Sequence, residues 1–140
     1  MATQPTTSNE PATGLRAEDI AAIHNLYAGY GHFIDEGDSE RFSHCFIPDG
    51  QLGTAGGEPL RGREAIAKFA GTPRPGLRHV VVNVHVEGDE DEAVGRAYFV
   101  ACDVSEGNVK VLITGRYRDS LRRVDGTWFF TRREFTPDSP

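Results

Sequence analysis

Cysteines, basic residues and long apolar runs are scarce in this sequence, and each shortage removes a class of protein. The chain has two cysteines in 140 residues, Cys45 and Cys102, too few for a disulfide scaffold and without the spacing of a zinc site. No apolar run approaches the roughly 18 residues of a membrane-spanning helix. The 15 Lys and Arg residues against 21 Asp and Glu residues leave a net charge of -6, the wrong sign for binding nucleic-acid phosphates. We therefore expect no metal site, no membrane segment and no nucleic-acid partner.

The length and the two ends of the chain predict one domain with short tails. A chain of 140 residues has room for a single hydrophobic core. Residues 1–14 contain no Lys or Arg and no apolar segment of a secretory signal, so we expect a cytoplasmic protein with reduced thiols. The Pro, Thr, Ser and Asn content of residues 1–14 predicts a disordered tail. Residues 15–136 are expected to form the domain, and residues 137–140 a second tail.

The first half of the sequence predicts a long amphipathic helix. From Ala17 to Ile34 the apolar positions step by three and four residues, which places them on one stripe of a helix. The stripe consists of Ile20, Ile23, Tyr27, Tyr30 and Ile34. Gly37 is a typical helix stop, and Asp38 can cap a following helix.

Two shorter helices and a short strand are expected next. The second helix spans Ser39–Phe46 and buries Phe42 and Phe46, after which Pro48-Asp49-Gly50 turns the chain. A short strand follows at Gln51–Gly53. The third helix spans Gly62–Ala70. Its apolar face consists of Ile66 and Phe69.

The second half of the sequence predicts four antiparallel strands. It is rich in β-branched and aromatic residues and is divided by short turn signals. The expected strands are Leu77–Glu87, Ala93–Val104, Val109–Leu121 and Thr127–Phe135. Such short connections favour sequential hairpins, so three helices are followed by a meander that folds over them. The predicted fold class is α+β.

Alternation along Leu77–Glu87 separates a valine face from a polar face. The valine face holds Val80, Val82, Val84 and Val86, and the other face holds His79, Val81, Asn83 and His85. Two interpretations stay open. Either the valines face the core and the polar residues face water, or the polar face lines a cavity under the helices and a second subunit covers the valines.

Asp35 stands at the end of the first predicted helix, near the negative end of the helix dipole, where a carboxylate is mildly disfavoured. It is either exposed in the acidic stretch 35–38 or accepts a hydrogen bond from a histidine in the core. A carboxylate partner fixes the tautomer of an imidazole and raises its pKa, so the other ring nitrogen becomes a better base. His79 is the candidate partner.

Other residues could bind or polarise a substrate. Tyr30 and, with less support, Tyr27 are either core residues or hydrogen-bond donors to a carbonyl or a leaving hydroxyl. In the next strand Ala97, Phe99, Ala101 and Asp103 share a face, and small residues beside an acid indicate room for a ligand. Asp103 could equally open the turn that follows. Arg116 belongs to a basic group between residues 110 and 133 that is either solvated or faces an acidic substrate.

Five short motifs between about Leu15 and Thr136 resemble the SnoaL-like branch of a cone-shaped fold. They are Tyr27-Ala28-Gly29-Tyr30, Asp35-Glu36-Gly37-Asp38, Phe46-Ile47-Pro48-Asp49-Gly50, Gly62-Arg63-Glu64-Ala65-Ile66 and Arg78-His79-Val80-Val81-Val82-Asn83. Nuclear transport factor 2, ketosteroid isomerase, scytalone dehydratase, lindane dehydrochlorinase and bile acid 7α-dehydratase share this fold. The resemblance implies three helices packed on a strongly curved, mainly antiparallel sheet.

The resemblance also implies a catalytic site. Asp35 and His79 match the dyad of the dehydratase and dehydrochlorinase members, and Tyr30 and Asp103 are similar to further site residues of the bile acid enzyme. Scytalone dehydratase has a second histidine where this chain has Ala101-Cys102-Asp103, which argues against that chemistry. An acid in this strand is also the isomerase pattern. Nuclear transport factor 2 binds partners without catalysis, so the fold alone does not establish an enzyme.

The resulting hypothesis is a cofactor-independent lyase, a dehydratase, that acts on a hydrophobic cyclic substrate of steroid-like or polyketide-like kind, free or thioester-linked. His79 would act as base, Asp35 would orient it, and Tyr30 and Asp103 would assist the leaving group. Tyr27, Asn83, Phe99 and Arg116 would contact the substrate. The alternatives are a double-bond isomerase or polyketide cyclase with the same dyad, and a non-catalytic binding or dimerisation module. We also expect a homodimer, because three helices cannot cover the valine face.

Overall fold

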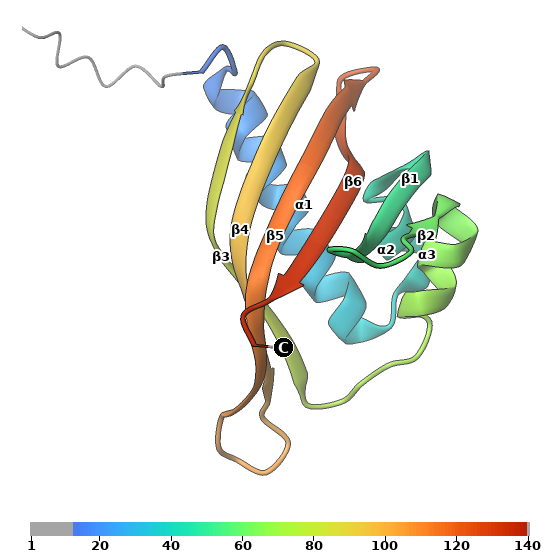
Figure 1. Ribbon diagram of the computed structural model, residues 1–140, viewed down its shortest axis with the longest axis vertical. Coiled ribbons are helices and arrows are strands. Elements are labelled where there is room, and N and C mark those ends of the chain that lie inside the picture. Colours follow the sequence, from blue (N-terminus) through green and yellow to red (C-terminus); the bar gives the residue numbers. More distant parts are fainter. Residues whose placement is uncertain (1–12, 140) are drawn as a thin grey trace, which may run out of the picture.

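The computed structural model describes residues 13–139, which form three helices and a six-stranded sheet (Figure 1). The helices are α1 (Ala17–Glu36), α2 (Ser39–Ser43) and α3 (Gly62–Ala70). The strands are β1 (Phe46–Thr54), β2 (Leu60–Arg61), β3 (Leu77–Gly88), β4 (Glu92–Asp103), β5 (Lys110–Val124) and β6 (Thr127–Pro137). The predicted three helices and four long strands are confirmed.

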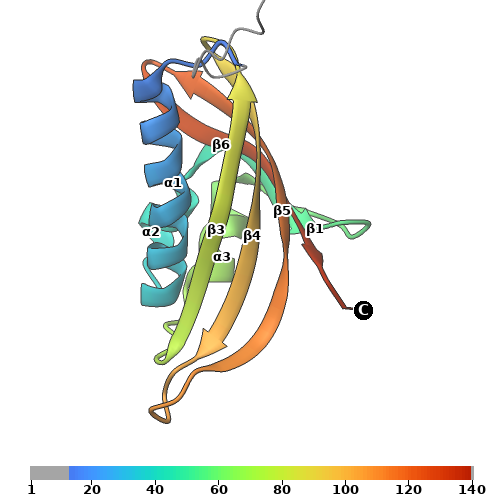
Figure 2. The ribbon, with the colours of Figure 1, turned by 90° about the vertical axis from the view of Figure 1, so that its left-hand side faces the viewer.

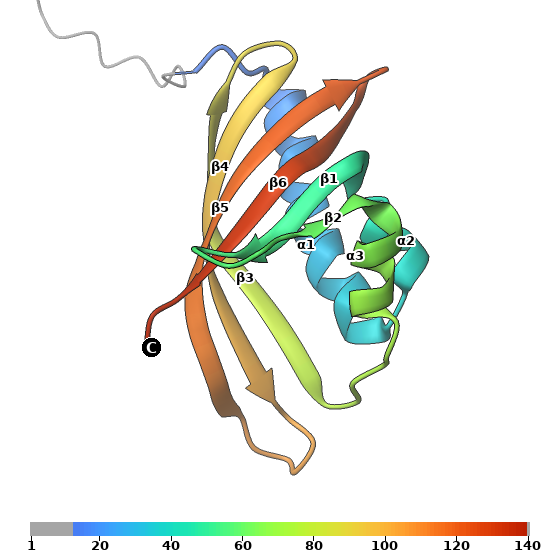
Figure 3. The same cartoon turned by 45° about the vertical axis from the view of Figure 1, so that its right-hand side comes forward.

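The sheet is curved and mixed, and the helices lie on its concave side. Its strand order is β2-β1-β6-β5-β4-β3, with β1 parallel to β6 and every other pair antiparallel. Figure 2 shows α1 lying along the concave side, and Figure 3 shows α2 and α3 at the β1–β2 end. Within residues 13–139, no helix covers the convex face. This is the α+β cone that the sequence predicted.

The amphipathic stripe of α1 forms the centre of the core. Four of its five predicted members, Ile23, Tyr27, Tyr30 and Ile34, are buried, and Ile20 packs beside them. Gly37 ends the helix in the left-handed conformation at φ 70°, and the Asp38 side chain accepts a hydrogen bond from the backbone N–H of Arg41 at the start of α2. The predicted stop and cap are therefore confirmed.

The region after α2 differs from the prediction. Helix α2 ends at Ser43, and Phe46 already belongs to β1. The expected turn at Pro48-Asp49-Gly50 lies inside β1, where the register against β6 shifts. Strand β1 pairs in parallel with the last strand of the sheet, and local turn preference carries no signal of such a distant partner. Phe69 is also not buried with Ile66, because 46% of it is exposed.

Strand β3 does not keep one valine face. Its register against β4 shifts between Val82 and His85, and Asn83 takes the left-handed φ of 55° that asparagine tolerates better than most residues. Before this irregularity His79 and Val81 lie on the helix side, while Val80 and Val82 are exposed. Beyond it Val84 and Val86 pack into the core. The predicted face of four valines is wrong, because the irregularity reverses the alternation.

The ends of the described chain are tied to the sheet. Thr13 and Gly14, assigned from the sequence to a tail, hydrogen-bond with Gly88, and the backbone N–H of Asp138 donates to Thr114. The rest of the predicted N-terminal tail lies outside the described residues.

Both cysteines are buried free thiols. None of the helices in residues 13–139 combines the length and the apolar character needed to cross a membrane.

Candidate active site

The end of α1 and the start of β3 bring Asp35 and His79 together. The Nδ1 atom of His79 lies 2.6 Å from Oδ1 of Asp35, and the backbone N–H of His79 donates to both carboxylate oxygens at 3.1 Å. The two side chains are only 10% and 14% exposed. Because an ionised carboxylate only accepts hydrogen bonds, it holds the proton on Nδ1 and leaves the lone pair on Nε2. The imidazole is therefore held in the tautomer whose Nε2 can accept a proton.

A glycine on α1 permits this close contact. Gly31 is buried against β3, and a Cβ atom there would lie 3.1 Å from the carbonyl oxygen of His79. The helix can thus approach the strand closely enough for the short Asp35 side chain to reach both the backbone and the ring of His79. Any larger residue at position 31 would push these elements apart.

His79 lines a largely apolar cavity of about 550 Å³ between the helices and the sheet. The buried residues of its lining are Tyr30, Ile34, Leu52, Phe99, Ala101 and Tyr117, and His79 and Phe135 are half-buried beside them. The ring of Phe99 packs against the imidazole, with centroids 5.2 Å apart. Exposed residues at the other end of the lining include Thr54, Glu58, Phe69 and Arg74. A cavity of this size and polarity suits a cyclic molecule with a few oxygen atoms.

A buried charged network, which the sequence patterns above do not predict, lies next to this cavity. The guanidinium of Arg133 and the carboxylate of Asp119 are both fully buried, with Nε and Oδ1 3.1 Å apart. The hydroxyl of Tyr27 donates a short hydrogen bond to Asp119. Burial raises the pKa of Asp119, and the charge of Arg133 opposes this shift. Asp119 alternates along β5 with the buried Tyr117 and Leu121, and this pattern was a readable signal.

Comparison with known proteins places this architecture in a family. A family model described as the SnoaL-like domain matches residues 15–134. The chain belongs to the SnoaL-like domain family. None of the curated proteins compared with the chain matches it. The family, its wider NTF2-like class and the cone fold are those that the sequence motifs predicted.

Several solved structures are similar to this SnoaL-like domain. An NTF2-like protein with a cystatin-like fold from Novosphingobium aromaticivorans shares 27% identity, with 87% of this chain and 83% of that chain covered and a TM-score of 0.80. A Mycobacterium tuberculosis protein of unknown function shares 30% identity over 86% and 72% of the two chains, with a TM-score of 0.78. A candidate scytalone dehydratase from Novosphingobium aromaticivorans shares 26% identity over 86% and 84%, with a TM-score of 0.73.

The SnoaL-like domain brings some predicted site residues to the cavity and leaves others elsewhere. Tyr30 and Phe99 line the cavity with His79, as expected. Asp103 does not line it. Its carboxylate accepts hydrogen bonds from the backbone N–H of Ser105 at 2.8 Å and from the Ser105 hydroxyl at 2.5 Å. These bonds lower the pKa of Asp103 and hold it at the turn after β4. The predicted place of Asp103 in the cavity is therefore wrong.

Three predicted substrate contacts are also absent from this cavity. Tyr27 is buried and directed to Asp119. Asn83 and Arg116 are exposed and border a separate hollow. For Asn83 the cause is the β3 irregularity, and for Arg116 it is the strict alternation of β5, which buries Gly115 and Tyr117 instead.

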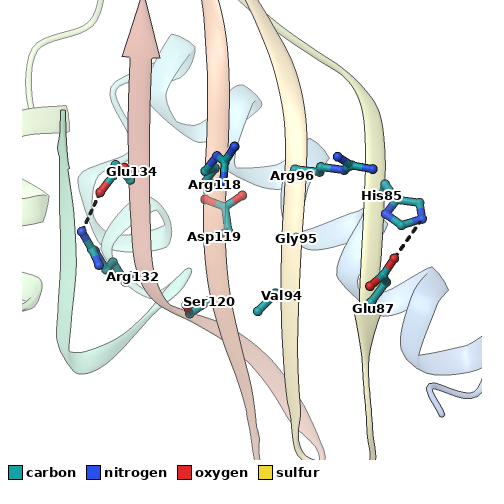
Figure 4. A pocket seen from close by; sticks show the side chains of 10 residues that line it. All are labelled: His85, Glu87, Val94, Gly95, Arg96, Arg118, Asp119, Ser120, Arg132 and Glu134. Atoms are coloured by element: carbon teal, nitrogen blue, oxygen red, sulfur yellow. Dashed lines mark hydrogen bonds and ion pairs between the residues drawn. The ribbon is translucent and has the colours of Figure 1, made fainter. Parts of the chain in front are cut away.

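The convex face of the sheet carries a charged hollow of about 520 Å³ (Figure 4). Arg96 and Arg118 stand opposite each other on β4 and β5. Ion pairs join Arg132 to Glu134 and His85 to Glu87 at the two sides.

No group of three His, Cys, Asp or Glu side chains among residues 13–139 is arranged to hold a metal ion. The apolar cavity that His79 lines is on the opposite, concave side of the sheet.

Proposed function

We propose that this SnoaL-like domain is a cofactor-independent lyase, a dehydratase, that acts on a hydrophobic cyclic substrate of steroid-like or polyketide-like kind, free or thioester-linked. The observation that carries the proposal is the His79–Asp35 pair, held by three hydrogen bonds at the wall of an apolar cavity. A similar structure named as a candidate scytalone dehydratase supports it. A non-catalytic module needs neither a buried Asp35–His79 pair nor an open cavity, so the presence of both supports the enzyme.

The geometry suits an elimination next to a carbonyl group. Nε2 of His79 takes a proton from the carbon beside the carbonyl, while the Asp35 carboxylate stabilises the imidazolium that forms. The hydroxyl of Tyr30 donates to the carbonyl oxygen, on which negative charge develops. The electron pair then forms a carbon–carbon double bond and expels the hydroxyl group from the next carbon. That hydroxyl receives the proton from His79 and leaves as water.

The decisive experiment is turnover of a panel of cyclic β-hydroxyketones by the purified chain and two variants. General base catalysis contributes about 10²–10⁴-fold, so His79→Ala should lose at least about 10²-fold in kcat. Asp35→Asn should lose at least about tenfold, because an amide does not stabilise the imidazolium by charge. His24→Ala, an exposed histidine on the same helix as Asp35, is the matched control and should keep full activity.

The mass of the product separates the proposal from its closest alternative. Loss of one water molecule identifies the dehydratase, whereas a product of unchanged mass identifies an isomerase or cyclase that uses the same dyad. Full turnover by folded His79→Ala would refute both enzymes.

We also propose that two copies of the chain associate through the convex face of the sheet. Val80 and Val82 on β3 and Tyr98 on β4 are 41%, 40% and 55% exposed, and Val82 and Tyr98 are direct cross-strand neighbours. Apolar side chains grouped on an open sheet are typical of an interface. A homodimer would remove this surface from water.

A further inference from the structure

Two arginines stand opposite each other on the convex side of the sheet without an acidic partner. Arg96 on β4 and Arg118 on β5 are direct cross-strand neighbours, and both are exposed. Among residues 13–139 neither guanidinium takes part in an ion pair or a hydrogen bond, and Figure 4 shows both lying between the two marked ion pairs of the hollow. Like charges directly opposite each other in a sheet are destabilising. Fold stability therefore does not account for this arginine pair.

The acids around the arginine pair are bound to other side chains. Glu134 stands directly opposite Arg118 in the register with β6, but its carboxylate accepts a hydrogen bond from Arg132 at 2.5 Å. The other two acids of the lining, Glu87 and Asp119, have basic partners of their own. The two positive charges of the arginine pair are therefore not neutralised by these acids.

Two hollows on the convex face meet at the arginine pair. Arg96 and Arg118 line both the hollow of about 520 Å³ and a neighbouring one of about 330 Å³. The smaller hollow also includes Tyr98, which is 55% exposed. A ligand can therefore place a charged group between the guanidiniums and an apolar group against the Tyr98 ring.

The charge of the arginine pair favours a phosphoryl group over a carboxylate. Each guanidinium presents a planar fork that binds the oxygens of either group in pairs. One carboxylate satisfies a single guanidinium, whereas the three terminal oxygens and nearly two negative charges of a phosphate monoester match two of them. The chain as a whole has a net charge of -6, so a general attraction of anions to the protein would not produce binding at this place.

We propose that Arg96 and Arg118 form a binding site for the phosphoryl group of a small phosphate monoester, with Tyr98 in contact with the organic part of the ligand. The site lies on the convex face and the His79 cavity on the concave side, so this inference does not depend on the proposed reaction. Tyr98 also belongs to the surface proposed above for association, so the test includes a variant that weakens the dimer.

Isothermal titration calorimetry of the purified chain with phenyl phosphate tests the site. One ligand should bind per chain, and binding should weaken as sodium chloride is added, because salt screens exposed charges. Phenyl sulfate has a similar shape and only one negative charge, so it should bind at least about threefold more weakly. Arg96→Gln and Arg118→Gln should each weaken the binding of phenyl phosphate about fivefold, as expected for an exposed ion pair of good geometry.

Arg122→Gln is the matched control. Arg122 is exposed on the same strand as Arg118, but it pairs with Glu92 and borders neither hollow. Its loss should leave the affinity unchanged. An effect of Arg122→Gln as large as that of Arg118→Gln, an unchanged affinity in Arg118→Gln, or equal affinity for the sulfate and phosphate esters would each overturn the site.

Two further measurements locate the ligand. In an NMR titration the shift changes should centre on the amides of Arg96, Tyr98 and Arg118, and changes centred on the His79 cavity would overturn the proposal. Val80→Glu should weaken the dimer and keeps both arginines, so it also reports binding where association covers the site. Absence of binding to both the unmodified chain and Val80→Glu would overturn the site.

Removal of the acid nearest to the arginine pair gives a test in the opposite direction. Glu134→Gln removes a negative charge opposite Arg118 and frees Arg132, so phenyl phosphate should bind about threefold more tightly. Glu92→Gln frees Arg122 in the same way but outside the two hollows, and it should have no effect. Unchanged or weaker binding by Glu134→Gln would contradict a phosphoryl group between the two arginines.

Discussion

The buried carboxylate of Asp19 connects α1 to β6. Its Oδ1 accepts a hydrogen bond from the Trp128 indole N–H at 3.1 Å, and its Oδ2 accepts one from the backbone N–H of Arg16 at 3.3 Å. The bond from Trp128 is the main cause of a lowered pKa for Asp19, with burial acting in the opposite direction. Ionised Asp19 therefore stabilises the fold above its unfolded pKa, and this contribution disappears as the pH falls through the folded pKa.

Asp19→Asn should therefore destabilise the protein at neutral pH and have less effect in acid. We expect a loss of about 1.5–3 kcal/mol in the free energy of unfolding at pH 7, as for other hydrogen bonds to a charged group. The difference from the unmodified chain should shrink below about pH 4, where the Asp19 carboxylate of the unfolded chain begins to be protonated. Urea unfolding at pH 7 and pH 3 measures both values. Glu18→Gln, at an exposed neighbouring carboxylate, is the control, and an equal loss at both pH values would contradict the prediction.

At the residue scale, the sequence predicted the dyad because its signals are local. An acid at a helix end and a histidine on the polar face of the following long strand can both be found without knowledge of the register. Arg133 could not be found in this way. The register between β5 and β6 shifts between Ser120 and Leu121, so Arg133 and not its neighbour Arg132 enters the core. The prediction that Asp103 lines the cavity was wrong for a different reason, because hydrogen bonds from Ser105 hold its carboxylate in the turn.

At the element scale, the distance between α1 and β3 depends on Gly31. Gly31→Ala would bring a Cβ atom to 3.1 Å from the backbone oxygen of His79, whereas Gly29→Ala would meet the movable ring of Phe33 at the same distance. Alanine is favoured over glycine within a helix by about 0.5–1 kcal/mol. Gly29→Ala should therefore raise the free energy of unfolding by about this amount.

Gly31→Ala should gain less than Gly29→Ala or lose stability, because backbone atoms must move to admit the methyl group. Turnover should also fall, since the helix carries Asp35 and the strand carries His79. Urea unfolding and the β-hydroxyketone assay measure the two effects. Equal stability gains and equal activity in the two variants would show that the α1–β3 distance is not limiting.

The elements themselves were predictable to different degrees. Helix α1 and strands β3 to β6 follow from periodicity and turn signals, and their ends differ from the prediction by a few residues. Strand β1 was recognised only at Gln51–Gly53, because its parallel partner β6 lies far away in the sequence. The irregularity at Asn83 was also missed, since the valine pattern continues through it.

At the scale of the whole molecule, the open convex face predicts association. The unmodified chain should sediment as a dimer at micromolar concentration. Val80→Glu should weaken the dimer at least about tenfold, because a carboxylate buried without a partner is costly. Val109→Glu is the matched control, because Val109 is 70% exposed in the turn between β4 and β5 and lies outside both strands. A monomeric unmodified chain at this concentration would reject the interface.

The place of β6 in the sheet has a consequence for how the chain folds. It is the last strand of the described residues, yet it lies in the middle of the sheet between β1 and β5. During synthesis α2, β1 and α3 emerge early and must wait for β6 before they can join the growing sheet. Pairing of β1 with β6 closes a loop that contains β2, α3 and β3 to β5, and closing so long a loop is slow. Partly synthesised chains expose unpaired strand edges until β6 is available. Ribosome-bound chains that stop before Thr127 should therefore remain protease-sensitive and depend on chaperones.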